Sequence, residues 1–318
     1  MRVAFVGKGG SGKTTLSSLF ARFAAVEGGA VVAIDADINQ HLGLVLGLEH
    51  DRLPEPLGGH LTEIKDYLRG DNPRIHSAAA MVKTTPPGRG SRLVRLDDPF
   101  FQGGFCVRAE GLSLMVTGPF AEEDLGVACY HSKVGAVELY LNHLVDGPGE
   151  YVVVDMTAGA DSFASGLFTR FDLTFLVAEP TRQGVGVYRQ YREYAADYDV
   201  PIAVIGNKVQ DEGDVAFLRD HVGDDLLVWL EHSPAVRAME QGRPFTLGDL
   251  EPANREALAT MLRRLDDQPK DWEKFGRQAV EFHLRNAEAW ANRATGEDLR
   301  AQVDPDFTFG PVPAGSPA

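Results

Sequence analysis

Short apolar runs rich in β-branched residues recur along much of the chain. They are continuous rather than alternating, which is the pattern of strands covered on both faces of a sheet. We expect strands at residues 3–6, 30–34, 151–154, 173–178, 202–205 and 226–230. Segments with helical spacing lie between most of them, at residues 13–26, 133–145, 185–196 and 214–222. This alternation predicts an α/β fold with a doubly wound, mostly parallel sheet.

The first departure from this pattern is an irregular insert at residues 48–111. It is rich in proline, glycine and charge, with one expected helix at residues 61–69. A solvated, mobile loop is the simplest interpretation, and a docking loop for an acidic partner or a nucleotide-sensing loop stays open. The middle of the insert carries four cations, Lys83, Arg89, Arg92 and Arg95.

The C-terminal residues form the second departure. A helix expected at residues 253–265 completes a main domain of residues 1–265. Residues 271–294 carry apolar side chains along one helical face, so we expect residues 266–300 to form a helical extension. Residues 301–318 are rich in proline and glycine, and we expect a disordered tail there.

Charge and cysteine content narrow the class of protein. The 318 residues include 46 acidic and 31 basic ones, for a net charge of −15. A chain this acidic repels phosphate backbones and anionic lipids, so we expect no nucleic-acid partner. Two cysteines give no disulfide framework, and no apolar stretch approaches the ~20 residues of a membrane helix. We therefore expect a cytoplasmic protein without a stable membrane anchor.

Residues 7–14, GKGGSGKT, match the phosphate-binding pattern G-x-x-x-x-G-K-[ST]. An expected strand precedes the pattern and an expected helix follows it, which is the context it requires. The glycines let backbone N–H groups point at phosphate oxygens, and the helix dipole adds to this attraction. Lys13 is expected to reach the β- and γ-phosphates and Thr14 to ligate Mg²⁺. The expected phosphate-binding set is Gly9, Gly10, Ser11, Gly12, Lys13, Thr14 and Thr15.

Lys8 follows the first glycine of this pattern and gives the sequence KGGSGKTT. In this feature the chain resembles the MinD/ParA-like ATPases, a deviant branch of the P-loop NTPases. In that family the extra lysine reaches across a dimer interface to the partner's nucleotide. The resemblance implies a homodimer that binds Mg²⁺ with ATP or ADP, and a role for Lys8 in stabilising charge in trans.

Carboxylates follow two of the expected strands. The resemblance implies that Asp37 orients the attacking water and that Asp35 supports Mg²⁺ through a water, although both are also suited to capping a strand end. Ile38 stands where many relatives carry proline. Asp155 ends an apolar run in a Walker-B pattern and is expected to hold Mg²⁺ through a water. Gly159 is expected to let the backbone approach the γ-phosphate.

Two later segments are similar to the base-binding parts of the family. Asn207 follows the expected strand at 202–205 and offers both a donor and an acceptor to adenine. Residues 233–236, which include Pro234, resemble the segment that closes over the base. Residues 241–244 are either part of that closure or a plain turn.

Residues 155–161 and 179–181 look most like those of CooC-type nickel-insertion ATPases, which assist the maturation of carbon monoxide dehydrogenase. That branch carries a metal-binding Cys-x-Cys pair, whereas this chain has Cys129 and His131 near that position. Two such pairs in a dimer would offer four ligands to Zn²⁺ or Ni²⁺. Structural roles for a buried Cys129 and a backbone-bonded His131 are the other interpretation.

The sequence therefore predicts an ATPase, slow and stimulated by a partner, that acts as a dimerising switch. Its catalytic residues would be Lys8, Lys13 and Asp37. Its output would be to mature, load or remodel a client protein. Two other functions stay open: a positioning ATPase of the MinD or ParA kind, and a nucleotide-binding regulator with little hydrolysis.

Overall fold

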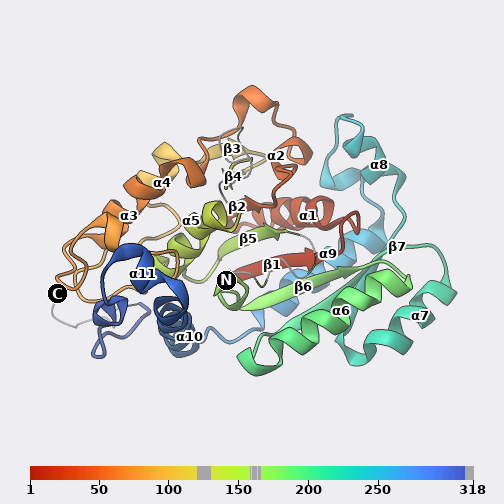
Figure 1. Cartoon of the computed structure of the whole chain (residues 1–318). Coiled ribbons are helices and arrows are strands. Elements are labelled where there is room, and N and C mark those ends of the chain that lie inside the picture. The colour runs from red at the N-terminus through yellow and green to blue at the C-terminus, as the bar shows by residue number, and fades with distance from the viewer. Residues whose placement is uncertain (120–129, 158, 160–162, 164–165, 312–318) are drawn as a thin grey trace.

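A twisted eight-stranded sheet runs through the computed structural model, which describes residues 1–119, 130–157, 159, 163 and 166–311 (Figure 1). The strand order is β3-β4-β2-β5-β1-β6-β7-β8. Pairing is parallel from β4 to β8 and antiparallel between β3 and β4. The strands are β1 Arg2–Gly7, β2 Ala30–Ala36, β3 Val107–Ala109, β4 Leu112–Val116, β5 Glu150–Met156, β6 Leu173–Ala178, β7 Ile202–Val209 and β8 Leu226–Glu231. The predicted fold class is confirmed.

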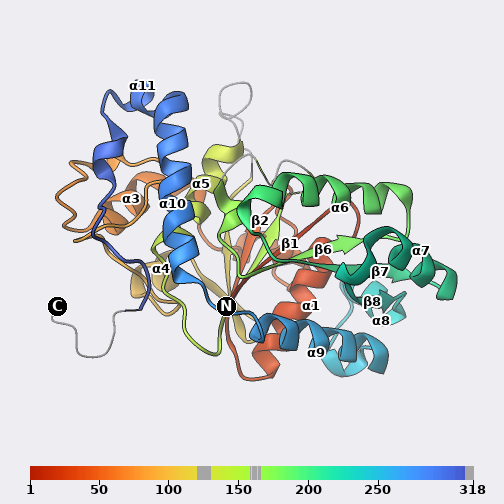
Figure 2. The same ribbon diagram turned by 90° about the horizontal axis from the view of Figure 1, so that it is seen from below.

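Helices cover both faces of the sheet, which explains the continuous apolar runs. On β1, Val3 and Phe5 face one hydrophobic cluster, and Ala4 and Val6 face the other. The first cluster includes α1 (Lys13–Val26) and α9 (Pro252–Asp266), which lie together below the sheet in Figure 2. The second includes α3 (Leu61–Arg69), α5 (Tyr130–His143), α6 (Arg182–Ala195) and α7 (Glu212–Val222). Shorter helices are α2 (Leu42–Val45), α4 (Pro99–Gly104) and α8 (Pro234–Glu240).

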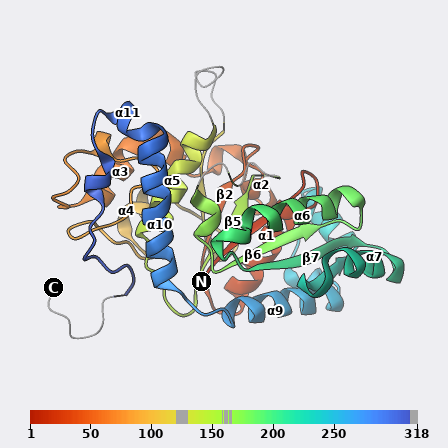
Figure 3. The ribbon, with the colours of Figure 1, turned by 60° about the horizontal axis from the view of Figure 1, so that its bottom comes forward.

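The C-terminal extension packs on the insert, at the opposite end of the molecule from α7 (Figures 2 and 3). It comprises α10 (Trp272–Asn286), a π-helical turn (Ala287–Ala291), α11 (Asn292–Thr295) and a 3₁₀ turn (Leu299–Gln302). His283 of α10 lies between the Thr84 hydroxyl, 3.4 Å away, and the Leu299 carbonyl, 2.9 Å away. The Gln302 amide donates to the carbonyl of Ala80 at 2.8 Å. These contacts hold the insert and the extension together.

The insert is packed rather than solvated. Met81 and Val94 are buried in the hydrophobic core. Two of its cations have partners as well, because Arg92 lies over the Tyr67 ring at 4.3 Å and Arg95 pairs with Glu150 at 2.9 Å. A third, Arg89, is 73% exposed and lies 3.9 Å from the Asp304 carboxylate. The interpretation as a mobile loop fails because the extension covers this segment.

The start of the expected disordered tail is folded too. Phe309 is 7% exposed and packs with Phe275 of α10 and with Val145. A Cβ on Gly310 would lie 3.0 Å from the Trp272 ring. Composition predicts disorder from residue 301, but aromatic side chains order residues 301–311. Residues 312–318 lie outside the described part of the chain.

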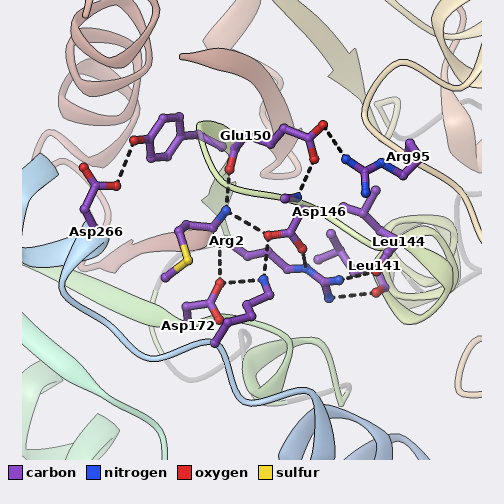
Figure 4. A network of polar contacts seen from close by, with 12 residues as sticks. Arg2, Arg95, Leu141, Leu144, Asp146, Glu150, Asp172 and Asp266 are labelled. Atoms are coloured by element: carbon purple, nitrogen blue, oxygen red, sulfur yellow. Dashed lines mark hydrogen bonds and ion pairs between the residues drawn. The ribbon is translucent and has the colours of Figure 1, made fainter. Parts of the chain in front are cut away.

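A buried network of charges joins the sheet to the segment that leads into the extension (Figure 4). The fully buried Arg2 guanidinium contacts Asp146 at 2.7 Å and the carbonyls of Leu141 and Leu144. Lys270, between α9 and α10, reaches Asp146 at 2.6 Å and Asp172 at 2.8 Å. Burial alone would raise the pKa of Asp146, but Arg2 and Lys270 hold it well below its usual value. Asp146 therefore stays ionised among three cations, the third being the Met1 amino group at 2.8 Å.

We found no helix, among the residues described, that is both long and apolar enough to cross a membrane.

His143 at the end of α5 makes folding stability depend on pH. The ring is fully buried, with Nδ1 2.9 Å from the Leu139 carbonyl oxygen. Burial lowers the pKa of His143 to about 4, against the opposing effect of that carbonyl. An unfolded chain binds this proton near pH 6.5. Between pH 6.5 and about 4, His143 is therefore protonated in the unfolded chain and neutral in the folded one. Proton binding to the unfolded chain lowers folding stability as the pH falls.

The free energy of unfolding should fall between pH 6.5 and 4.5 in both proteins. We expect this fall to be about 2 kcal/mol smaller in His143→Leu than in the wild type. Urea unfolding at both pH values measures this difference, and carboxylate titrations common to the two proteins cancel in it. Replacement of the exposed His50 by leucine is the control and should leave the pH dependence unchanged. Equal pH dependence in the His143 variant and the wild type would contradict the expectation.

Candidate functional site

The loop between β1 and α1 forms a cradle at the carboxyl ends of the strands. Gly12 caps α1 with φ 93°, a left-handed conformation that favours glycine. A Cβ at this position would also lie 2.2 Å from the Asn207 side chain. A cavity of about 470 Å³ opens beside the loop. Its lining includes Gly9, Gly10, Gly12, Lys13, Thr14 and Thr15, whereas Ser11 is fully buried.

Three predicted carboxylates converge on this cradle from neighbouring strands. The register of β2 and β5 places Asp35 directly opposite Asp155. The Thr14 hydroxyl donates to Asp155 Oδ2 at 2.6 Å, and Lys13 Nζ lies 3.7 Å from Asp37 Oδ2. The parallel sheet therefore brings together residues that are far apart in the sequence.

The buried carboxylates favour a cation at this place. Burial raises the pKa of Asp155 to about 7, although Lys13 and the Thr14 hydroxyl pull it down. Burial and the charge of Asp155 raise the pKa of Asp35 well above its usual value. Oδ1 of Asp155 is buried without a hydrogen-bond partner among the described residues. These oxygens and the Thr14 hydroxyl fit Mg²⁺, which uses one or two carboxylates together with substrate phosphates.

The loop that carries Asp37 is held by hydrogen bonds rather than by a proline. The carboxylate of Asp37 accepts from the backbone and the side-chain amide of Asn39, both at 2.9 Å. The Gln40 side chain donates to the Thr117 hydroxyl at 2.9 Å, and the Thr117 backbone donates to the Asp35 carbonyl at 2.9 Å. Ile38, at the position of the proline, is 36% exposed. Neither Gln40 nor Thr117 belongs to a sequence motif, so neither is recognisable as a site residue from the sequence.

A second cavity, of about 310 Å³, continues from the cradle toward β8. Asn207 lines it, and its amide donates to the Ser11 carbonyl at 2.7 Å. Pro234 begins α8, whose cap is the Ser233 side chain, 3.0 Å from the Val236 amide. The apolar side of this cavity is made by Leu16, Leu19, Leu230 and Val236. Its size and mixed lining suit a planar base.

Lys8 belongs to the loop between β1 and α1 and directly precedes Gly9, which lines the 470 Å³ cavity. Its side chain is 37% exposed, and its Nζ lies 3.8 Å from Glu179 Oε2. Lys208 donates to Glu179 Oε1 and to the Gly10 carbonyl, each at 2.6 Å. Lys208 and Glu179 thus brace the loop that holds Lys8. The motif around Asn207 includes Lys208, but nothing in the sequence shows that it touches the cradle.

Other predicted site residues lie at the limit of the described chain. Gly159 has φ 67°, and residues 158 and 160–162 next to it are outside the description. Cys129 also lies outside it, and only the backbone of His131, in the first turn of α5, is described. Within the residues described, His, Cys, Asp and Glu form no group of three or more placed to hold a metal ion. The approach of Gly159 to the γ-phosphate and the binding of a transition metal by Cys129 and His131 therefore stay predictions.

Comparison with known proteins agrees with this geometry. The carbon monoxide dehydrogenase accessory protein CooC of Rhodospirillum rubrum is 29% identical over 267 residues, which is 83% of this chain and 96% of CooC. A putative plasmid partition protein of Borrelia burgdorferi, solved with AMPPNP, has a TM-score of 0.56 at 13% identity, over 83% of this chain and 99% of that one. A ParA family ATPase of Chlorobium tepidum has a TM-score of 0.52 at 15% identity, over 88% of this chain and 96% of that one.

The family comparison covers most of the chain. Residues 3–245 match the CobQ/CobB/MinD/ParA nucleotide-binding domain. This range contains the cradle, the converging carboxylates and the residues of the second cavity described above. The protein therefore belongs to the CobQ/CobB/MinD/ParA family of nucleotide-binding proteins.

Proposed function

We propose that this chain is an ATP-dependent switch that dimerises, hydrolyses ATP and thereby acts on a client protein. The observation that carries the proposal is the position of Lys8. It directly precedes Gly9, a lining residue of the 470 Å³ cavity, and its partly exposed side chain has one ion pair at 3.8 Å. An ion pair this long and exposed contributes little stability. Lys8 is therefore able to leave Glu179 for a nucleotide held by a second copy.

Hydrolysis of the β–γ bond follows from the residues around the cradle. Lys13 and the loop amides hold the phosphates, and Asp37 faces the same cavity and orients the attacking water. Lys13 in cis and Lys8 in trans stabilise the charge that develops on the phosphate oxygens. Mg²⁺, held by Thr14 and supported by Asp35 and Asp155, supplies further positive charge when bound. Closure with ATP and opening with ADP would then give two states.

We expect Lys8→Ala to weaken ATP-dependent dimerisation at least about 10-fold, because one charge-assisted contact across the interface is lost. Sedimentation velocity with Mg²⁺ and a non-hydrolysable ATP analogue measures the monomer–dimer equilibrium. Arg89→Ala, which removes an exposed cation of the insert, is the control and should dimerise like the wild type. Monomeric wild-type protein with bound analogue would contradict dimerisation, and an unchanged Lys8 variant would contradict the role in trans.

The similarity to CooC supports a client that is a metalloenzyme, and a net charge of −15 disfavours a chromosome-bound positioning role. The link to Zn²⁺ or Ni²⁺ rests on the Cys129 and His131 pattern alone. Because Asp37→Ala should hold ATP without hydrolysis, its trapped dimer is the form in which to search for the client.

A further inference from the structure

Glu240, the last residue of α8, places a carboxylate inside the nucleotide site. Its Oε1 accepts a hydrogen bond from the Thr15 hydroxyl at 2.6 Å. Glu240 and Thr15 are lining residues of both the 470 Å³ cavity beside the cradle and the 310 Å³ cavity beside Asn207. Glu240 therefore lies at the junction of the two cavities.

The charge of this carboxylate decides which part of a nucleotide it suits. Within the described residues, no Lys, Arg or His side chain pairs with Glu240, and the Thr15 hydroxyl is its hydrogen-bond donor. An unneutralised carboxylate repels phosphate oxygens, but it is a strong acceptor for hydroxyl groups. Between the phosphates and the base, the groups of a nucleotide that donate hydrogen bonds are the ribose hydroxyls.

The backbone around Glu240 holds the carboxylate in place. Ser233 caps α8 and Pro234 starts it. Asn254 of α9 accepts from the Glu231 amide at 2.9 Å, which fixes the chain just before the helix. Glu240 therefore projects from a short but anchored helix rather than from a loop.

We propose that Glu240 is a specificity-determining residue that reads the ribose hydroxyls and favours ribonucleotides over deoxyribonucleotides. The inference rests on the proposed function, because it assumes ATP in the two cavities. On binding, the carboxylate exchanges the Thr15 hydroxyl for hydroxyls of the ribose, so the acceptor stays satisfied. A deoxynucleotide leaves part of the acceptor without a donor and binds less tightly.

Isothermal titration with Mg²⁺ and ATP, 2′-deoxy-ATP or 3′-deoxy-ATP tests the proposal. We expect the wild type to bind ATP about 10-fold or more tightly than at least one deoxy analogue, as for a hydrogen bond to a charged group. Glu240→Ala should bring the ratio to within about twofold, and Glu240→Gln, which keeps a neutral acceptor, should lie between. Glu256→Ala, at a 71% exposed carboxylate on α9, is the control and should keep the wild-type ratio.

The outcomes separate this proposal from the function on which it rests. A ratio unchanged in Glu240→Ala overturns the specificity role. So does an equal gain of affinity for all three nucleotides, which would show that Glu240 merely obstructs the cradle. Absence of ATP binding by the folded wild type would overturn the proposed function, and the present inference with it. Circular dichroism of each variant shows whether the fold is retained.

Discussion

Asp37→Ala is expected to lower the rate of ATP hydrolysis at least about 100-fold while Mg-ATP still binds. A positioned carboxylate that orients or deprotonates water contributes about 10²–10⁴-fold to a rate. Asp37 is placed for this role, because it lines the 470 Å³ cavity beside the loop. Its Oδ1 accepts a hydrogen bond from the Asn39 backbone, which fixes the carboxylate. Removal also frees Lys13 from the 3.7 Å ion pair, so ATP affinity should be kept or improved.

Single-turnover hydrolysis with radiolabelled ATP, together with equilibrium binding, separates these two effects. Asp66→Ala is the matched control, because Asp66 is an exposed carboxylate on α3, 67% accessible, paired with Arg69. Its turnover should equal that of the wild type. If Asp37→Ala hydrolyses ATP within tenfold of the wild-type rate, the water is oriented by another group.

Lys13→Ala is expected to weaken Mg-ATP binding at least about 100-fold. The lysine is 6% exposed and points into the cradle, so each charge-assisted hydrogen bond to a phosphate forms in a largely dehydrated place. Loss of two such bonds, at about 1.5–3 kcal/mol each, corresponds to a factor of 100 or more.

Equilibrium dialysis with labelled ATP measures this loss directly. Lys65→Ala, at the lysine of α3, removes the same charge away from the phosphate cavity and should leave the affinity unchanged. Unaltered ATP binding by Lys13→Ala would mean that the loop at residues 7–14 does not hold the nucleotide, and the proposed function would fail.

The sheet was largely predictable because both of its faces are covered. Strands such as β1 and β6 are buried along their whole length, and this leaves an apolar run that sequence alone reveals. The β3–β4 pair was missed. β3 has only three residues with Arg108 exposed, although the run LSLMV of β4 was a usable signal. Residues 301–311 of the expected disordered tail are folded because Phe307 and Phe309 pack against the extension despite the prolines and glycines around them.

The sequence points to candidate site residues where one loop or one strand end supplies them. Asp35 and Asp155 were identified separately, and the strand register brings them together. Thr117 and Glu240 reach the site from distant segments and belong to no local pattern, and the motif that contains Glu179 does not show that its carboxylate contacts Lys8 and Lys208. Their positions depend on how strands and helices pack, which spacing along a sequence does not encode.

Lys270 ties the nucleotide-binding domain to the C-terminal helices. A chain shortened after α9 would leave Asp146 and Asp172 buried with one partner fewer, and would remove the Phe275 ring that lies against the Arg2 guanidinium. Removal of one partner from a buried ion cluster costs several kcal/mol. Heating should therefore unfold the nucleotide-binding domain and the C-terminal extension in a single cooperative transition. The smallest stable unit should extend through Phe309 rather than end at residue 245, where the family match ends.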